Sequence, residues 1–239
     1  MRRRLLLLAL VAAAVGGAAP SGASAGTECE GLIVCIPVKG PWVQVQGGAA
    51  ATYYQLSCPG RGQIIGGLDA DRAGPLELSF LGTLGGPVGP GVTTSRSAVF
   101  VARTTLSLAS FRPLLGCIPA SGGGGRARTS YEPKRKLMAA APGPVPDATI
   151  RRVKNVRLKE APTERVSHGC PAGERLLAWS TAIAFRRDRP LALSAIGSVR
   201  ASARRAGSRV AVRVRSGITR PEGVRVELQI HAICVRGPS

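Results

Sequence analysis

The chain has 239 residues and a formal net charge of +20, with 33 Lys and Arg against 13 Asp and Glu. Hydrophobic residues make up 44% of the chain, which is enough for packed cores and excludes a wholly disordered protein. No apolar run reaches the length of about 18 residues that a transmembrane helix needs, which excludes a polytopic membrane protein. The length allows one large domain or two small ones.

The first 25 residues have the order of a secretory signal peptide. A basic start, Arg2–Arg4, is followed by the apolar stretch Leu5–Val15 and by an Ala-x-Ala cleavage site at 23–25. The apolar stretch is too short to span a membrane, so we expect cleavage before Gly26 rather than an uncleaved anchor. The predicted mature protein is secreted, extracellular or associated with the cell wall, and has no membrane span.

Six cysteines follow the predicted signal peptide, and an even number in an exported protein indicates disulfides. We predict the pairs Cys29–Cys35, Cys58–Cys117 and Cys170–Cys234. The second and third pairs close long loops of similar length. In the chain-entropy model each of these two disulfides stabilises the fold by about 4 kcal/mol.

The two long-loop pairs follow from a diverged internal repeat. Segment 58–65 aligns without gaps to 170–177, and both segments begin with Cys-Pro. The next aligned segments are 75–82 with 190–197, and 99–103 with 210–213. Each copy then ends at a second cysteine, so four matches in one order predict a duplication.

Both copies show the period-two alternation of half-buried antiparallel strands. The longest case is Val224–Cys234, and the same pattern appears at 43–45, 76–80 and 209–215. Arg204–Gly207 predicts a hairpin turn between strands.

One segment, Glu174–Phe185, is ambiguous. Leu176, Trp179 and Ile183 would share one face of a helix, but the alignment of this segment to Gln63–Ala70 favours a strand.

We therefore predict an all-β protein made of two tandem, disulfide-stapled antiparallel β-sandwich-like modules. The predicted organisation is a signal peptide at 1–25, β module 1 at 26–120, a basic Gly/Pro-rich linker at 121–148 and β module 2 at 149–239.

The second copy opens with Cys-Pro-x-Gly at 170–173, and the first opens with the close variant Cys-Pro-Gly at 58–60. With an apolar pair after each opening and a closing cysteine, the two copies resemble modules in poorly characterised secreted proteins of high-GC Gram-positive bacteria. The second copy has Ala178-Trp179 where the first has Gly66-Gly67. The resemblance implies export, disulfides and β modules, and it implies no activity.

The sequence contains no nucleophile elbow, no His-Glu-x-x-His and no P-loop motif. No catalytic residue, metal or cofactor is therefore expected. His168, Cys170, His231 and Cys234 have the composition of a zinc site, but on strands His231 and Cys234 do not share a face. His231 lies on the predicted outward face of its strand, so we expect a solvated surface histidine.

An alternative function is a secreted hydrolase with a site at the module interface, built from Asp69, Asp71 and His168. A solvated turn is the favoured explanation of the two aspartates. A weaker third option is an enzyme inhibitor that uses the loop Gly82–Gly91.

The charge is concentrated in the second part of the chain: residues 26–120 carry a net +1 and residues 121–239 a net +16. The candidate polyanion-binding residues are Arg151, Arg152, Lys154, Arg209, Arg213 and Arg215. The alternative is a solvated face whose arginines reflect codon usage.

The leading prediction is a non-catalytic secreted protein, structural or binding, that weakly binds anionic polysaccharides or envelope polymers through module 2. We expect a monomer. Sequence-specific nucleic-acid recognition is not expected, because the basic region lacks interleaved aromatic residues.

Overall fold

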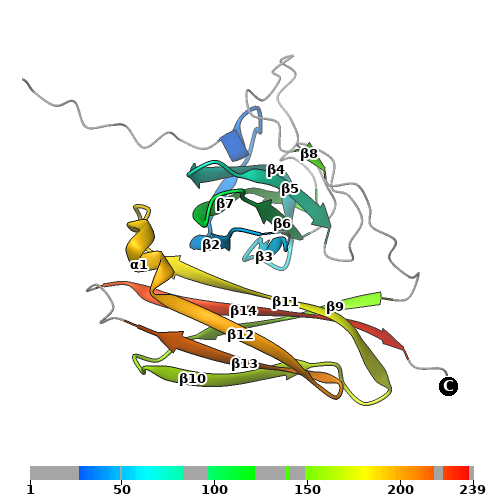
Figure 1. Ribbon diagram of the computed structural model, residues 1–239. Coiled ribbons are helices and arrows are strands. Elements are labelled where there is room, and N and C mark those ends of the chain that lie inside the picture. Colours follow the sequence, from blue (N-terminus) through cyan, green and yellow to red (C-terminus); the bar gives the residue numbers. More distant parts are fainter. Residues whose placement is uncertain are drawn as a thin grey trace, which may run out of the picture.

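Figure 1 shows the computed structural model of the chain, which describes residues 27–48, 50–82, 96–121, 138–139, 149–217 and 223–236. The predicted signal peptide lies outside the described residues, as do most of the predicted linker and residues 83–91 of the predicted inhibitor loop. Within the described ranges, no helix is both long enough and apolar enough to cross a membrane.

The described chain is nearly all β-structure, as predicted. Its first half contains η1 (Thr27–Cys29), β1 (Ile36–Lys39), β2 (Trp42–Gln46), β3 (Thr52–Ser57), β4 (Gln63–Ala73), β5 (Glu77–Gly82), β6 (Ser97–Arg103) and β7 (Leu108–Pro119). After β8 (Met138–Ala139), the second half contains β9 (Thr149–Arg157), β10 (Thr163–Gly169), β11 (Glu174–Arg186), α1 (Leu193–Gly197), β12 (Val199–Ala206), β13 (Arg209–Ser216) and β14 (Arg225–Arg236). Glu174–Phe185 is therefore a strand, as the alignment indicated.

The two halves repeat one pattern of strand pairing. In the first half β7 lies between β2 and β4, and β6 lies between β3 and β5. In the second half β14 lies between β9 and β11, and β13 lies between β10 and β12. All of these pairs are antiparallel, and the repeated order supports the predicted duplication.

The disulfides join the predicted pairs: Cys29–Cys35, Cys58–Cys117 and Cys170–Cys234. The two long-loop disulfides occupy equivalent places. Cys117 is opposite Ile65 in the β4–β7 ladder, and Cys234 is opposite Leu176 in the β11–β14 ladder. A β-bulge follows directly in both ladders, so the resemblance of the two copies extends to a local irregularity of the backbone.

The sequence alignment fails at one place. Segment 75–82 contributes β5, whereas its aligned partner 190–197 contains the short helix α1. The true counterpart of β5 is β12, because β5 pairs with β6 and β12 with β13. The predicted hairpin turn also shifts: β12 continues through Ala206, and Gly207 makes the turn with a positive φ of 63° that suits glycine.

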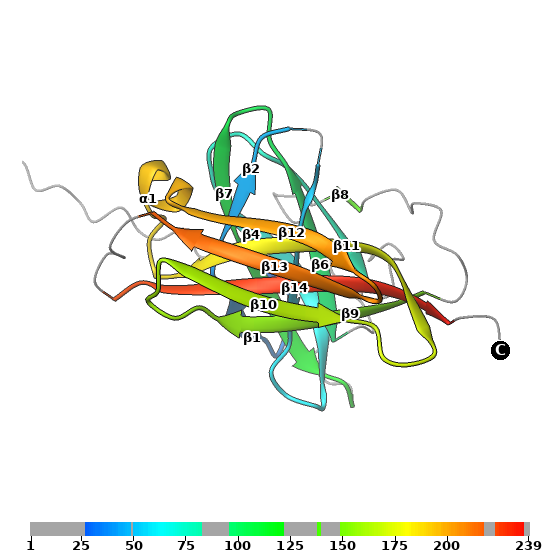
Figure 2. The same ribbon diagram turned by 60° about the horizontal axis from the view of Figure 1, so that its bottom comes forward.

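The two halves of the described chain share one β-sheet. Strand β2 of the first half pairs with β11 of the second, which joins strands of both halves in one seven-stranded sheet. Figure 2 shows the long strands of the two halves running across one another. The proposed module boundaries at 120 and 149 remain a prediction, because the described halves share a sheet.

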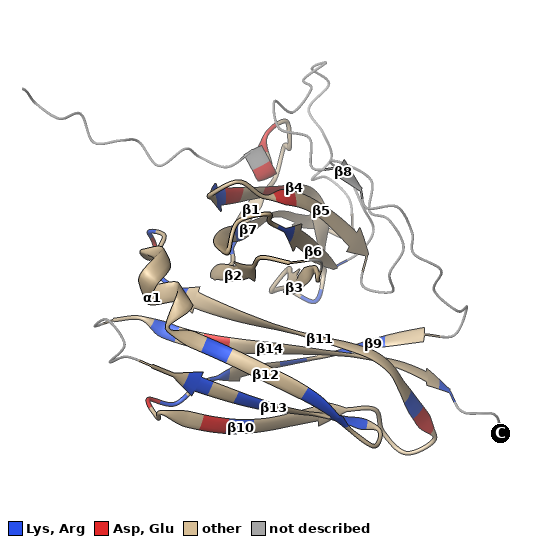
Figure 3. Cartoon of the chain, viewed as in Figure 1, with Lys and Arg blue, Asp and Glu red and all other residues tan. Residues whose placement is uncertain are grey.

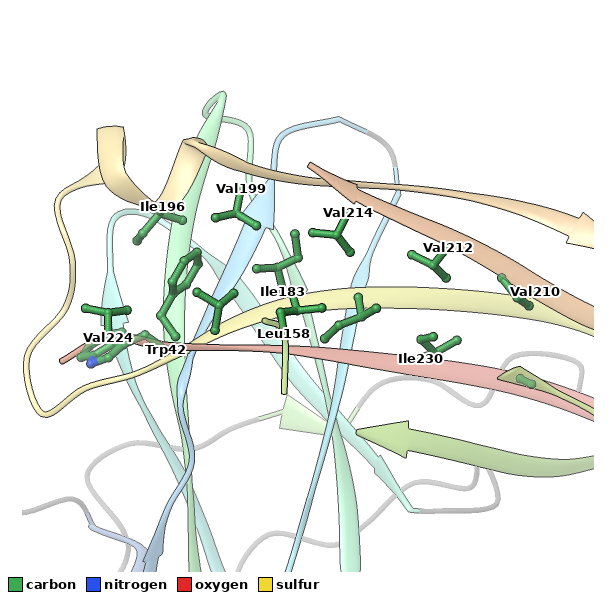
Figure 4. Packing of buried hydrophobic residues seen from close by; sticks show 14 of the residues in the cluster. Trp42, Leu158, Ile183, Ile196, Val199, Val210, Val212, Val214, Val224 and Ile230 are labelled. Carbon is green, nitrogen blue, oxygen red and sulfur yellow. The ribbon is translucent and has the colours of Figure 1, made fainter. Parts of the chain in front are cut away.

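Strand β11 is buried on both of its faces where the halves meet. Ile183 and Phe185 belong to the core of the second half, while Ala182 and Ala184 belong to the core of the first. Trp42 makes the reverse contribution, since it lies on β2 but packs in the second core with a side chain that is 4% exposed. Figure 4 shows this core, in which apolar side chains fill the space between the two sheets.

Candidate polyanion-binding face

The outer side of the β10–β13–β12 sheet is rich in arginine. On β13, Val210, Val212 and Val214 are buried, so the alternate positions point outward. Residues directly opposite one another in an antiparallel ladder share a face, which brings positions of β10 and β12 to the same side. The arginine face, as we name it, consists of the exposed side chains Arg165, Arg200, Arg204, Arg209, Arg213 and Arg215. Figure 3 shows these basic positions along β12 and β13.

Like charges are brought close together on this face. Arg165 is directly opposite Arg213, and Arg200 is directly opposite Arg215. Like charges in such cross-strand pairs are destabilising. None of the six arginines forms an ion pair with a carboxylate that the structure describes. The face therefore concentrates positive charge without internal neutralisation, which favours an anionic partner.

A groove of about 550 Å³ lies on this face. Ala211, Ser167 and Ser202 are small residues among its lining, and Arg165, Arg204 and Arg213 belong to the same lining. The planar guanidinium fork binds phosphate and sulfate oxygens in pairs, and serine hydroxyls donate to the same oxygens. The arrangement can hold oxyanion groups along an extended chain.

Three of the predicted polyanion-binding residues belong to the arginine face: Arg209, Arg213 and Arg215. Lys154, on β9, borders it. Its Nζ donates to the carbonyl oxygen of Ser167 at 3.2 Å, and Arg209 Nη2 donates to the hydroxyl of the same serine at 3.0 Å.

The structure places the other two predicted residues elsewhere. Arg152 makes a bidentate ion pair with Glu174, with N–O distances of 2.8 and 2.5 Å. Arg151 donates to Nδ1 of His231, on β14 of its own half, at 3.1 Å. Its guanidinium also lies over the ring of Tyr53, on β3 of the first half, 5.7 Å from the ring centroid. Burial lowers the pKa of Arg151. Successive residues of a strand face opposite ways, so the basic run at 151–154 cannot form one patch.

Sequence reasoning missed Arg165, Arg200 and Arg204. A signal for the last two is present, because Arg200, Ser202 and Arg204 alternate with Val199 and Ala201. That alternation predicts a row of outward arginines on this strand. Only the register of the β12–β13 hairpin shows that the row lies beside the arginines of β13.

The residues of the hydrolase alternative are not brought together. Asp71 accepts two hydrogen bonds from Arg112 on β7, at 2.8 and 2.5 Å. His168 lies on β10 in the other half, where burial is the main cause of its lowered pKa and Arg209 and Lys154 lower it further. No described contact links His168 to either aspartate, so the geometry offers no shared catalytic site.

His231 is buried, contrary to the expected surface position, with 0% of the residue exposed. It does face away from the core of its own half, but β3 of the first half covers it. Arg151 can only donate, so His231 Nδ1 accepts, and Nε2 carries the proton that is donated to Gln229 Oε1 at 2.6 Å. Burial, followed by the charges of Arg151 and His168, lowers the pKa of His231 to about 3.

The cysteines of the considered zinc set are oxidised. Cys170 and Cys234 form a disulfide with a Cα–Cα distance of 5.7 Å, so neither offers a thiolate. Both ring nitrogens of His231 are already hydrogen-bonded.

The fold and this face define a disulfide-stapled all-β protein with a basic sheet surface. The chain matches none of the family models, curated proteins or solved structures with which it was compared. The case for its function therefore rests on its own geometry.

Proposed function

We propose that the protein is a non-catalytic, exported binding protein that holds anionic polymers of the cell envelope on its arginine face. One observation carries this proposal: six exposed arginines share one sheet face and none is paired with a described carboxylate. Export is supported by three disulfides, which persist in oxidising compartments, and by the predicted signal peptide.

The charged residues of this face are arginines and not lysines, which favours phosphate and sulfate groups as ligands. The guanidinium fork of arginine makes two parallel hydrogen bonds to one oxyanion, whereas a lysine ammonium group does not. No aromatic side chain occurs among the outward residues of these three strands, so stacking on bases contributes nothing. We therefore expect binding that depends on charge density and not on base sequence.

The test uses the protein from Gly26 onward with teichoic acid and heparin as probes. The face variant combines Arg165→Gln, Arg204→Gln and Arg213→Gln. We expect it to lose about tenfold or more in affinity and to show a weaker dependence on salt.

A matched control removes three exposed arginines from other strands: Arg72→Gln, Arg103→Gln and Arg225→Gln. It changes the net charge by the same amount. If both triple variants lose the same affinity, the protein binds through its total charge and the face is not a site. If the unaltered protein binds neither probe at low salt, the proposal is wrong.

A further inference from the structure

A second groove, of about 480 Å³, lies where the two halves meet. It is formed by β2 and the segment that follows it, by β11 and by β12, which lie close together in Figure 1. It does not coincide with the groove of the arginine face, although both use β12. Ala203 lines both grooves, but Ala201 lines only this second groove, and Ser202 and Arg204 line only the other.

A partly exposed tryptophan lines this groove. The chain has only two tryptophans, and the first, Trp42, is buried in the core. The second, Trp179, lines the groove and keeps 37% of its residue surface exposed. Tyr53 is a further aromatic residue in the lining. An indole that remains partly open in a concave site provides a flat apolar surface on which a ligand can stack.

Polar groups of fixed position accompany the indole. Gln44 is 5% exposed, and its Nε2 donates to the carbonyl oxygens of Ile196 and Val199 at 2.9 and 3.4 Å. These bonds fix the amide, and no described donor occupies its Oε1. Gln46, Ser180 and Thr181 add an exposed amide and two hydroxyls to the lining.

The described lining contains no charged residue, although the chain carries a net charge of +20. An anion would bind more tightly at the arginine face than in this groove. The groove therefore suits an uncharged ligand. A pyranose ring combines a flat C–H face, which stacks on an indole, with hydroxyls that pair with amides and other hydroxyls. Small residues such as Ala201, Ala203 and Gly48 leave room for such a ring.

We propose that this groove binds a neutral saccharide unit, with Trp179 as the stacking platform and Gln44, Gln46 and Thr181 as hydroxyl partners. None of the six arginines of the arginine face lines this groove.

The experiment titrates the full disulfide-bonded protein with uncharged oligosaccharides: cellotetraose, chitotetraose, mannotetraose and maltotetraose. Tryptophan fluorescence and its quenching by acrylamide are the readouts, since Trp179 is the accessible indole and Trp42 is buried. We expect at least one of these sugars to protect Trp179 from the quencher. Trp179→Ala should weaken calorimetric binding by about tenfold or more.

The matched control is Leu177→Ala, which removes an exposed apolar side chain of the same strand that does not line the groove. It should keep the wild-type affinity. The triple face variant should also keep it, so failure of the polyanion proposal would leave this result unaffected. Lack of binding to all four sugars, or equal affinity of Trp179→Ala and wild type, would overturn the saccharide site.

Discussion

The side-chain amide of Gln229 forms two hydrogen bonds with the backbone of Gln55. Its Nε2 donates to the Gln55 carbonyl oxygen at 2.9 Å, and its Oε1 accepts from the Gln55 amide at 2.6 Å. Gln229 lies on β14 and Gln55 on β3, so a side chain of one half satisfies the strand backbone of the other. The same amide also bonds to Asn155 and His231. This polar contact joins strands of the two halves.

Gln229→Leu should destabilise the protein by about 1–3 kcal/mol, because it leaves the N–H and C=O of Gln55 without their partner in a partly buried place. Urea unfolding followed by circular dichroism measures the loss. The matched substitution Gln46→Leu, at an exposed position of β2, should change stability by less than about 0.5 kcal/mol. Equal effects of the two substitutions would show that the Gln229–Gln55 contact contributes no stability.

His231 should make the fold sensitive to acid. Its pKa in the folded protein is about 3, below the ordinary value of 6.5, so between these values the unfolded chain binds a proton that the folded chain does not. The stability that depends on neutral His231 is complete above pH 6.5 and is lost as the pH falls toward 3, by an amount on the order of several kcal/mol.

His231→Gln removes this titration, and a pH series of urea unfolding should therefore give a shallower slope for the variant between pH 6.5 and 3. Identical slopes for variant and wild type would mean that His231 accepts its proton without loss of the interface.

Trp42→Ala should cost about 3–5 kcal/mol, because the indole fills the core of the second half and Arg112 lies over its ring, 5.1 Å from the centroid. Trp42 is on a strand of the first half, so both halves should unfold in one transition at a lower temperature. Fluorescence of Trp179 and far-ultraviolet circular dichroism report the second half and the whole fold. Two separated transitions in the wild-type protein would contradict this coupling.

The disulfides should differ in how much they stabilise the fold. Cys170 and Cys234 are separated by 64 residues, whereas Cys29 and Cys35 are separated by six. Chain entropy predicts a loss of about 4 kcal/mol for replacing the first pair with serines and about 2 kcal/mol for the second. Denaturant unfolding of the two double variants tests the order. A larger loss of stability from removing the short-loop disulfide would show that its contribution comes from local packing around η1 and not from loop length.

Much of the local structure could be predicted from the sequence. Alternation at Val224–Cys234 reports which side chains face a core, because a strand turns successive residues to opposite sides. The repeated Cys-Pro segments identified two disulfides, since duplicated strands place their cysteines at equivalent positions. The outward positions of Arg209, Arg213 and Arg215 followed from the same period.

The tertiary structure alone decided what covers the other side of each strand. Period two shows that His231 and Arg151 face away from the core of their own half, but not that β3 of the other half lies over them. It also cannot show that Trp42 crosses into the second core, or that Trp179 lines a groove while Leu177 does not. Sequence patterns determine the faces of each strand, because they arise from local backbone geometry. The partner of each face depends on the packing of segments far apart in the chain, which local geometry does not encode.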